Sequence, residues 1–84
     1  MQTGTQFTGQ LGPNASGQWF TFGWPAAWHV VWHVMPTTPQ GGAPEIEWGV
    51  AVERASADQI TYWITVKNLT GATVDFDGRY LVAN

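Results

Sequence analysis

The two histidines are the first residues whose spacing could support chemistry. His29 and His33 are four positions apart, and on a helix that spacing would place both imidazoles on one face, where they could chelate a metal ion. Pro25 and the β-branched residues nearby instead favour a strand, in which residues four apart are separated by about 13 Å at about 3.3 Å per residue. We therefore expect no metal site and interpret both histidines as polar positions on a sheet face or in an interface.

Paired carboxylates are the second candidate. Asp75 and Asp77 share one strand face about 7 Å apart, which lies within the separation of about 5 to 9 Å that glycosidases use. Arg79 falls on the same face and is expected to neutralise them, so we interpret this face, like Glu45 and Glu47, as a solvated one. A small hydrolase using the two aspartates remains an alternative. No nucleophile elbow or phosphate-binding loop is present, so we expect neither an enzyme nor a cofactor.

Exposed tryptophan could bind a ligand without catalysis. The chain has six tryptophans in 84 residues. Trp63 lies between Thr61 and Thr65, and Trp19 flanks Thr21, on the polar faces of their predicted strands. An exposed indole beside hydroxyl groups is a typical platform for the apolar face of a pyranose ring. The alternative is burial between subunits, because a monomer that exposed these rings would carry a large apolar patch.

Composition excludes several other functions. Charged residues make up 11% of the chain and apolar residues 44%, and the net charge is −3. One lysine and two arginines are too few to bind nucleic acid or an anionic membrane surface, and no segment approaches the roughly 18 apolar residues of a membrane span. The absence of cysteine excludes a disulfide scaffold. No signal peptide is visible at the N-terminus, and the compartment stays unknown, with a cytoplasmic and a non-classically secreted protein both open.

The elements that position these candidate residues are strands, because apolar residues alternate with period two almost throughout. Six strands are predicted, over Gln2–Gln10, Gln18–Trp24, Trp28–Met35, Glu45–Arg54, Gln59–Asn68 and Thr73–Val82. Links rich in Gly, Pro, Asn and Ser separate them. The pattern predicts a single antiparallel domain over residues 1–84, either a sandwich or a barrel, in which the last three strands form a meander.

Within these strands, alternation predicts which residues share a face. We expect Phe20, Phe22 and Trp24 on one face of their strand, and Trp19 and Thr21 on the other. The strand at Trp28–Met35 is apolar on both faces, which is typical of a central strand or of one used in an interface. Inward positions are predicted for further apolar residues of the last three strands: Ile46, Trp48, Val50, Val52, Ile60, Tyr62, Ile64, Val66, Val74, Phe76, Tyr80 and Val82.

Several landmarks follow one another in a distinctive order: Gln2-Thr3-Gly4, Phe20-Thr21-Phe22 with Pro25, the apolar strand Trp28 to Val34, a long polar loop, Val50, Val52 and Arg54, Ile60, and the last strand Phe76 to Val82. Over most of the chain this order resembles the H-type lectins, small six-stranded antiparallel β-sandwiches that assemble as trimers and bind sugars. The resemblance implies the sandwich rather than the barrel, and a homotrimer or possibly a hexamer.

The resemblance also implies where a sugar would bind. In these lectins the sugar lies in a shallow groove between subunits, held by a polar residue of the first loop, an Arg on the fourth strand, and a Trp-His pair after the fifth. The corresponding positions here fall near Asn14, near Trp48, and at Lys67-Asn68. The stacking ring would then come from Trp48 or Trp63. These departures from the family pattern leave the identity of the sugar open.

We therefore expect a non-catalytic carbohydrate-binding lectin that is multivalent through oligomerisation. The predicted ligand-binding residues are Asn14, Trp48, Trp63, Lys67 and Asn68. The alternative is a structural or assembly module in which the exposed aromatic residues form subunit interfaces.

Overall fold

The computed structural model describes all residues from Met1 to Asn84 and contains six strands and no helix. The strands are β1 (Gln2–Leu11), β2 (Ser16–Pro25), β3 (Val30–Pro36), β4 (Ile46–Arg54), β5 (Gln59–Asn68) and β6 (Val74–Val82). All pairings are antiparallel. The predicted six-stranded antiparallel β-sandwich is confirmed. The chain has no helix long and apolar enough to cross a membrane.

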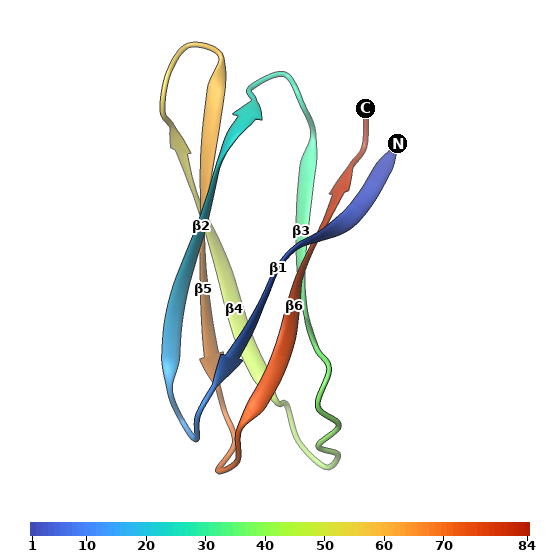
Figure 1. Cartoon of the computed structure of the whole chain (residues 1–84), viewed down its shortest axis with the longest axis vertical. Coiled ribbons are helices and arrows are strands. Elements are labelled where there is room, and N and C mark those ends of the chain that lie inside the picture. The colour runs from blue at the N-terminus through green and yellow to red at the C-terminus, as the bar shows by residue number, and fades with distance from the viewer.

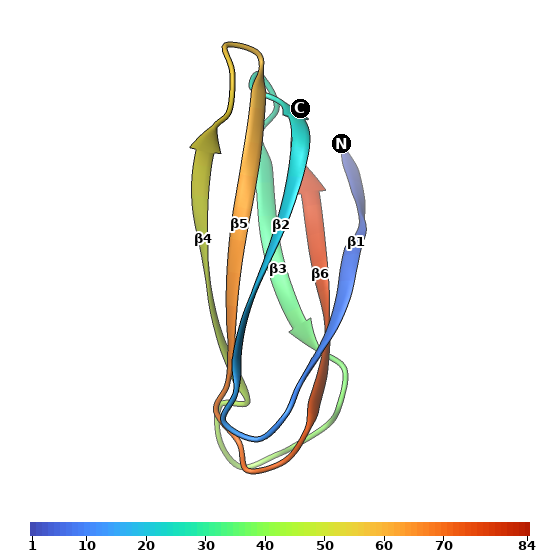
Figure 2. The same cartoon turned by 60° about the vertical axis from the view of Figure 1, so that its left-hand side comes forward.

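The strands form two three-stranded sheets, ordered β1-β6-β3 and β2-β5-β4. Figure 1 and Figure 2 show them as two layers packed face to face, with β3 and β4 along one margin. The expected meander of the last three strands is wrong: β4 and β5 form a hairpin, but β6 crosses to the other sheet and lies between β1 and β3. β3 is likewise an edge strand rather than a central one.

Asn68 at the end of β5 holds the crossing from one sheet to the other. Its side chain is fully buried. The Nδ2 atom donates to the carbonyl oxygens of Leu11, Gly12 and Ala72, and Oδ1 accepts from the backbone N–H and the hydroxyl of Thr70. These bonds tie the β1–β2 turn to the β5–β6 turn. They satisfy the buried carbonyl of Leu11 and part-buried backbone groups of both turns.

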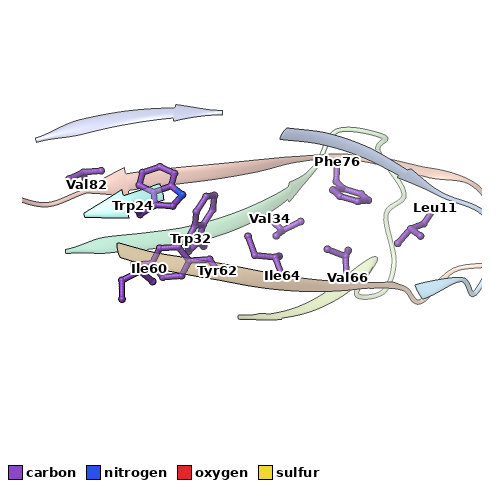
Figure 3. Close-up of a cluster of buried hydrophobic side chains, with 10 residues drawn as sticks. All are labelled: Leu11, Trp24, Trp32, Val34, Ile60, Tyr62, Ile64, Val66, Phe76 and Val82. Atoms are coloured by element: carbon purple, nitrogen blue, oxygen red, sulfur yellow. The ribbon is translucent and has the colours of Figure 1, made fainter. Parts of the chain in front are cut away.

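The core lies between the sheets and consists of alternate residues of every strand except β4, from which only the partly buried Ile46 and Trp48 pack against it. Figure 3 shows its ten side chains, Leu11, Trp24, Trp32, Val34, Ile60, Tyr62, Ile64, Val66, Phe76 and Val82. Most of the predicted inward residues of the last three strands are in this cluster or pack against it. Val50 and Val52 lie on the inner side of edge strand β4, yet both are exposed, Val52 by 65%. The β3/β4 margin of the sandwich is therefore open.

A register shift in β2 changes which of its residues face inward. Thr21 pairs with Tyr62 and Trp24 with Ile60, so β2 advances three residues while β5 advances two. Gly23 supplies the positive φ of 81° within this bulge. As a result Trp24 points to the same side as Thr21, and the expectation that it shares a face with Phe20 and Phe22 is wrong.

Candidate functional site

The outer face of the β2-β5-β4 sheet carries a group of aromatic rings that no other part of the chain covers. Phe20 is 59% exposed and Phe22 73% exposed. The register places Phe20 beside Trp63 of β5. The ring centroids of Phe20 and Trp63 are 5.1 Å apart and those of Phe20 and Phe22 are 6.3 Å apart, with both pairs of planes inclined by 29°. We call Phe20, Phe22 and Trp63 the outer aromatic row.

Trp63 is the fixed member of this row. Its Nε1 donates to a carboxylate oxygen of Glu53, on the neighbouring strand β4, over 2.8 Å. The indole is half-buried, between Phe20 on one side and Ala51 of β4 on the other. A ring held in this way loses little side-chain freedom when a ligand packs on it.

Next to the outer aromatic row lies a polar groove of about 300 Å³. Its lining residues are Ser16, Glu47, Trp48, Gly49, Thr65 and Lys67. The register aligns Gln18, Thr65 and Gly49 across the three strands, and then Ser16, Lys67 and Glu47. Gly49 has no side chain, and a Cβ there would meet nothing within 4 Å. The surface at Gly49 is therefore recessed between the outer aromatic row and the charged residues Lys67 and Glu47.

Lys67 and Glu47 at the far end of the groove are both exposed and oppose each other across β5 and β4. They do not form a salt bridge, since the single salt bridge of the chain joins Arg79 to Asp77. The groove therefore offers an ammonium donor, carboxylate acceptors and the Thr65 hydroxyl, none of which is used by another side chain. These groups can hydrogen-bond the hydroxyls of a polyol.

Three of the five predicted ligand-binding residues belong to this region. Trp63 and Lys67 lie on the outer face, and Trp48 contributes to the groove wall. The Trp48 ring itself packs against the core and lies edge to face with His33, at 6.1 Å between centroids. It is therefore not the stacking platform. Trp63 is the predicted ring that remains available for that role.

The two predicted asparagines have different environments. Asn14 is exposed in the β1–β2 turn, two residues before Ser16, with a positive φ of 56°. Its backbone N–H donates to the carbonyl of Thr70 over 3.0 Å. The prediction that Asn68 binds the ligand is wrong. Its side chain is fully buried and its amide group is hydrogen-bonded within the fold, so it cannot reach a ligand.

The prediction of Trp19 as an exposed platform is also wrong. Trp19 packs against the core from the inner side of β2, with its ring 5.0 Å from that of Phe76 at 88°. Phe20 and Phe22, predicted on the same face as the buried Trp24, occupy the exposed face instead. The signal that could have identified them is Gly23, because a glycine inside a strand pattern often marks a bulge.

The other groups with possible chemistry are dispersed or occupied. No three His, Asp or Glu side chains gather into a metal site. Asp77 is paired with Arg79 at 3.2 Å, as expected, and Asp75 accepts a hydrogen bond from Gln10 over 2.8 Å. Both aspartates border a larger hollow of about 520 Å³ on the outer face of the β1-β6-β3 sheet, which has no exposed ring beside it. The Nδ1 of His29 lies 2.8 Å from the side-chain oxygen of Asn84 at the C-terminus.

Comparison of the chain with protein-family models, with curated proteins and with solved structures finds no match.

Proposed function

We propose that this chain is a non-catalytic carbohydrate-binding domain whose binding surface is the outer face of the β2-β5-β4 sheet. The observation that carries the proposal is the outer aromatic row beside the groove lined by Ser16, Glu47, Trp48, Gly49, Thr65 and Lys67. Aromatic rings bind the polarised C–H groups on the apolar face of a pyranose, and hydroxyl, amide and charged groups hydrogen-bond sugar hydroxyls. Phe20 and Trp63 supply the first kind of contact, and Thr65 and Lys67 the second.

The same face lacks the arrangement of carboxylates that sugar hydrolysis needs. Glu53 is hydrogen-bonded to Trp63, and Glu47 is six residues away on β4, which is about 20 Å along an extended strand. Carboxylates that cleave a glycosidic bond are at most about 9.5 Å apart. A bound sugar would therefore be held on this face without being cleaved.

A shallow open surface binds each sugar weakly, so the proposal includes several copies of the domain acting together. The H-type lectin resemblance implies a homotrimer, possibly a hexamer. The open β3/β4 margin supports self-association, since Val50 and Val52 are exposed on the inner side of β4 and Val31 is exposed on the outer face of edge strand β3. Burying these side chains against a second copy would remove apolar area that a monomer leaves in water.

The proposal is tested by a glycan array followed by titration of intrinsic tryptophan fluorescence with the sugars that bind. Phe20→Ala and Phe22→Ala keep all six tryptophans, so the signal survives in both variants. We expect each variant to weaken binding by about threefold to tenfold, the value of one aromatic contact. Thr5→Ala, on the outer face of the other sheet, is the matched control and should bind as the original chain does. Equal affinity in all three variants would rule out this face as the binding surface.

The alternative function is a structural or assembly module, and the exposed valines of the β3/β4 margin favour it. In that case the outer aromatic row is a second subunit interface. Light scattering and the fluorescence titration separate the two functions. An oligomer whose size falls on Phe20→Ala substitution, and whose emission no sugar changes, would support the assembly module and contradict sugar binding.

A further inference from the structure

The outer face of the β2-β5-β4 sheet is open along the direction of its strands. Trp63 and Lys67 are four residues apart on β5, which is about 13 Å at about 3.3 Å per residue. Phe22 at one end is 73% exposed, and Ser16, Glu47 and Lys67 at the other end are exposed as well. No loop or bulky side chain closes either end. The strip of outer-face side chains from Phe22 to Lys67, which we call the binding track, is therefore longer than one pyranose ring and open at both ends.

The chemistry changes in order along this track. The aromatic row comes first, then the low row of Gln18, Thr65 and Gly49, and finally the opposed Lys67 and Glu47. One ring packed on Phe20 would leave the groove near Lys67 empty. A second and a third ring of the same chain would place their hydroxyls over the groove. Because Lys67 and Glu47 carry opposite charges, the groove has no net charge and matches a neutral chain rather than an anionic one.

We infer that the site recognises internal units of an extended, neutral oligosaccharide rather than a single terminal sugar. The inference rests on the proposed function, because it assumes that the face binds carbohydrate. A pocket for one terminal sugar must enclose most of the ligand's surface. This face contacts each unit from one side only, so its affinity has to come from several consecutive units.

The length dependence of binding tests the inference. The probes are cello-, xylo-, manno- and malto-oligosaccharides of one to six units, titrated calorimetrically against the full chain. In the series that binds, affinity should rise about tenfold or more from one unit to four, as expected from two additional hydrogen bonds, and then level off. A single sugar that binds within about twofold of the tetrasaccharide would overturn the inference and leave the proposed function standing. Binding of no probe at any length would count against the proposed function itself.

Gly49→Val locates the additional units. A Cβ at Gly49 meets nothing within 4 Å, so this variant should fold as the original chain does, while the valine fills the middle of the groove. We expect it to abolish the gain in affinity from one unit to four, so that the tetrasaccharide binds no more tightly than a single unit does. Phe20→Ala is the matched variant at the aromatic end and should weaken binding at every length. If Gly49→Val leaves tetrasaccharide affinity unchanged while circular dichroism shows a folded chain, the groove is not part of the site and the inference fails.

Discussion

The buried rings of Trp24, Trp32 and Tyr62 pack edge to face inside the sandwich, whereas on the outer face of the β2-β5-β4 sheet the rings lie close to parallel. Trp24 and Trp32 meet at 82°, and Trp32 and Tyr62 at 61°; both ring pairs of the outer aromatic row are inclined by only 29°. The inner rings fill a closed space and come from both sheets (Figure 3). The outer rings come from neighbouring strands of a single sheet and are aligned by its register.

The two groups of rings therefore differ in what they can do. The buried rings stabilise the fold, and the exposed rings are available to a ligand. The inner cluster is out of contact with water, so its contact area stabilises the fold directly. Phe20 and Phe22 remain mostly exposed, and removing either would forfeit little buried area. Phe20 and Phe22 can therefore be changed with little effect on stability, which makes the outer aromatic row open to direct test as a binding surface.

The largest effect is expected from truncating an inner ring. Trp32→Ala should lower the free energy of unfolding by about 3–5 kcal/mol, because it leaves a cavity among Trp24, Tyr62 and Tyr80. Phe22→Ala, at 73% exposure, should lower it by no more than about 0.5 kcal/mol. Urea denaturation followed by circular dichroism measures both. If Phe22→Ala proved as costly as Trp32→Ala, the distinction between the two aromatic groups would be wrong.

The two asparagines extend the same comparison to polar residues. Asn68→Ala should cost about 3 kcal/mol, because the buried carbonyl of Leu11 loses its donor, at about 1–3 kcal/mol, and the part-buried carbonyls of Gly12 and Ala72 lose theirs. Asn14→Gly, in the exposed turn, should be close to neutral because glycine adopts the positive φ without strain. Asn14→Ala should cost about 1 kcal/mol for the left-handed backbone. Thermal unfolding of the three variants tests this ranking, and a neutral Asn68→Ala would contradict the role assigned to that amide.

Alternation along the sequence was sufficient to predict the fold class and most strand limits. The fifth strand is predicted and observed over Gln59–Asn68, and the inward positions Ile60, Tyr62, Ile64 and Val66 are correct. The alternation of apolar and polar residues depends only on the strand's own sequence, and it is the same whichever strand lies beside it. The pairing itself is not local, and for that reason the place of the last strand in the other sheet was missed.

The candidate site was predicted only in part, for a related reason. Alternation shows which residues share a face but not which face is inward, and in β2 both faces carry large aromatic residues. The bulge at Gly23 then moves Trp24 to the side of Trp19, leaving Phe20 and Phe22 outside. Trp63 is identified from the sequence because β5 has one clearly apolar face and one polar face, whereas Lys67 and Asn68 come from the resemblance to the H-type lectins. The resemblance does not distinguish Lys67, which faces outward, from Asn68, which bonds backbone carbonyls at the strand end.

Within the inner cluster, the two indole N–H groups should differ by about 1 kcal/mol. Nε1 of Trp24 donates to the Thr21 hydroxyl over 3.0 Å, whereas Nε1 of Trp32 is buried without an acceptor. Substitution by phenylalanine removes a similar volume at both positions, but only Trp24→Phe also loses a hydrogen bond. We expect Trp24→Phe to be less stable than Trp32→Phe by about 1 kcal/mol. Equal destabilisation in urea would show that the Trp32 N–H is satisfied in solution.

The smallest expected effect is the contribution of Tyr62, in the inner cluster, to the pH dependence of stability. Burial raises the pKa of the Tyr62 hydroxyl above its usual value of about 10. Below pH of about 10 the hydroxyl is protonated in both the folded and unfolded chains, so its contribution to stability is fully present. As the pH rises further, the unfolded chain loses this proton first, and the free energy of unfolding falls until the folded-state pKa is passed.

Urea denaturation at several pH values between about 8 and 11 measures that fall, whose slope cannot exceed about 1.4 kcal/mol per pH unit for one proton. Tyr62→Phe should lose part of the alkaline slope, while Tyr80→Phe, the matched control, keeps the Tyr62 contribution. Phe20→Ala should keep it too, because the outer aromatic row takes no part in burying Tyr62. If Tyr62→Phe retained the full slope, the alkaline destabilisation would have to come from other groups. The burial of Tyr62 would then have no effect on the pH dependence of stability.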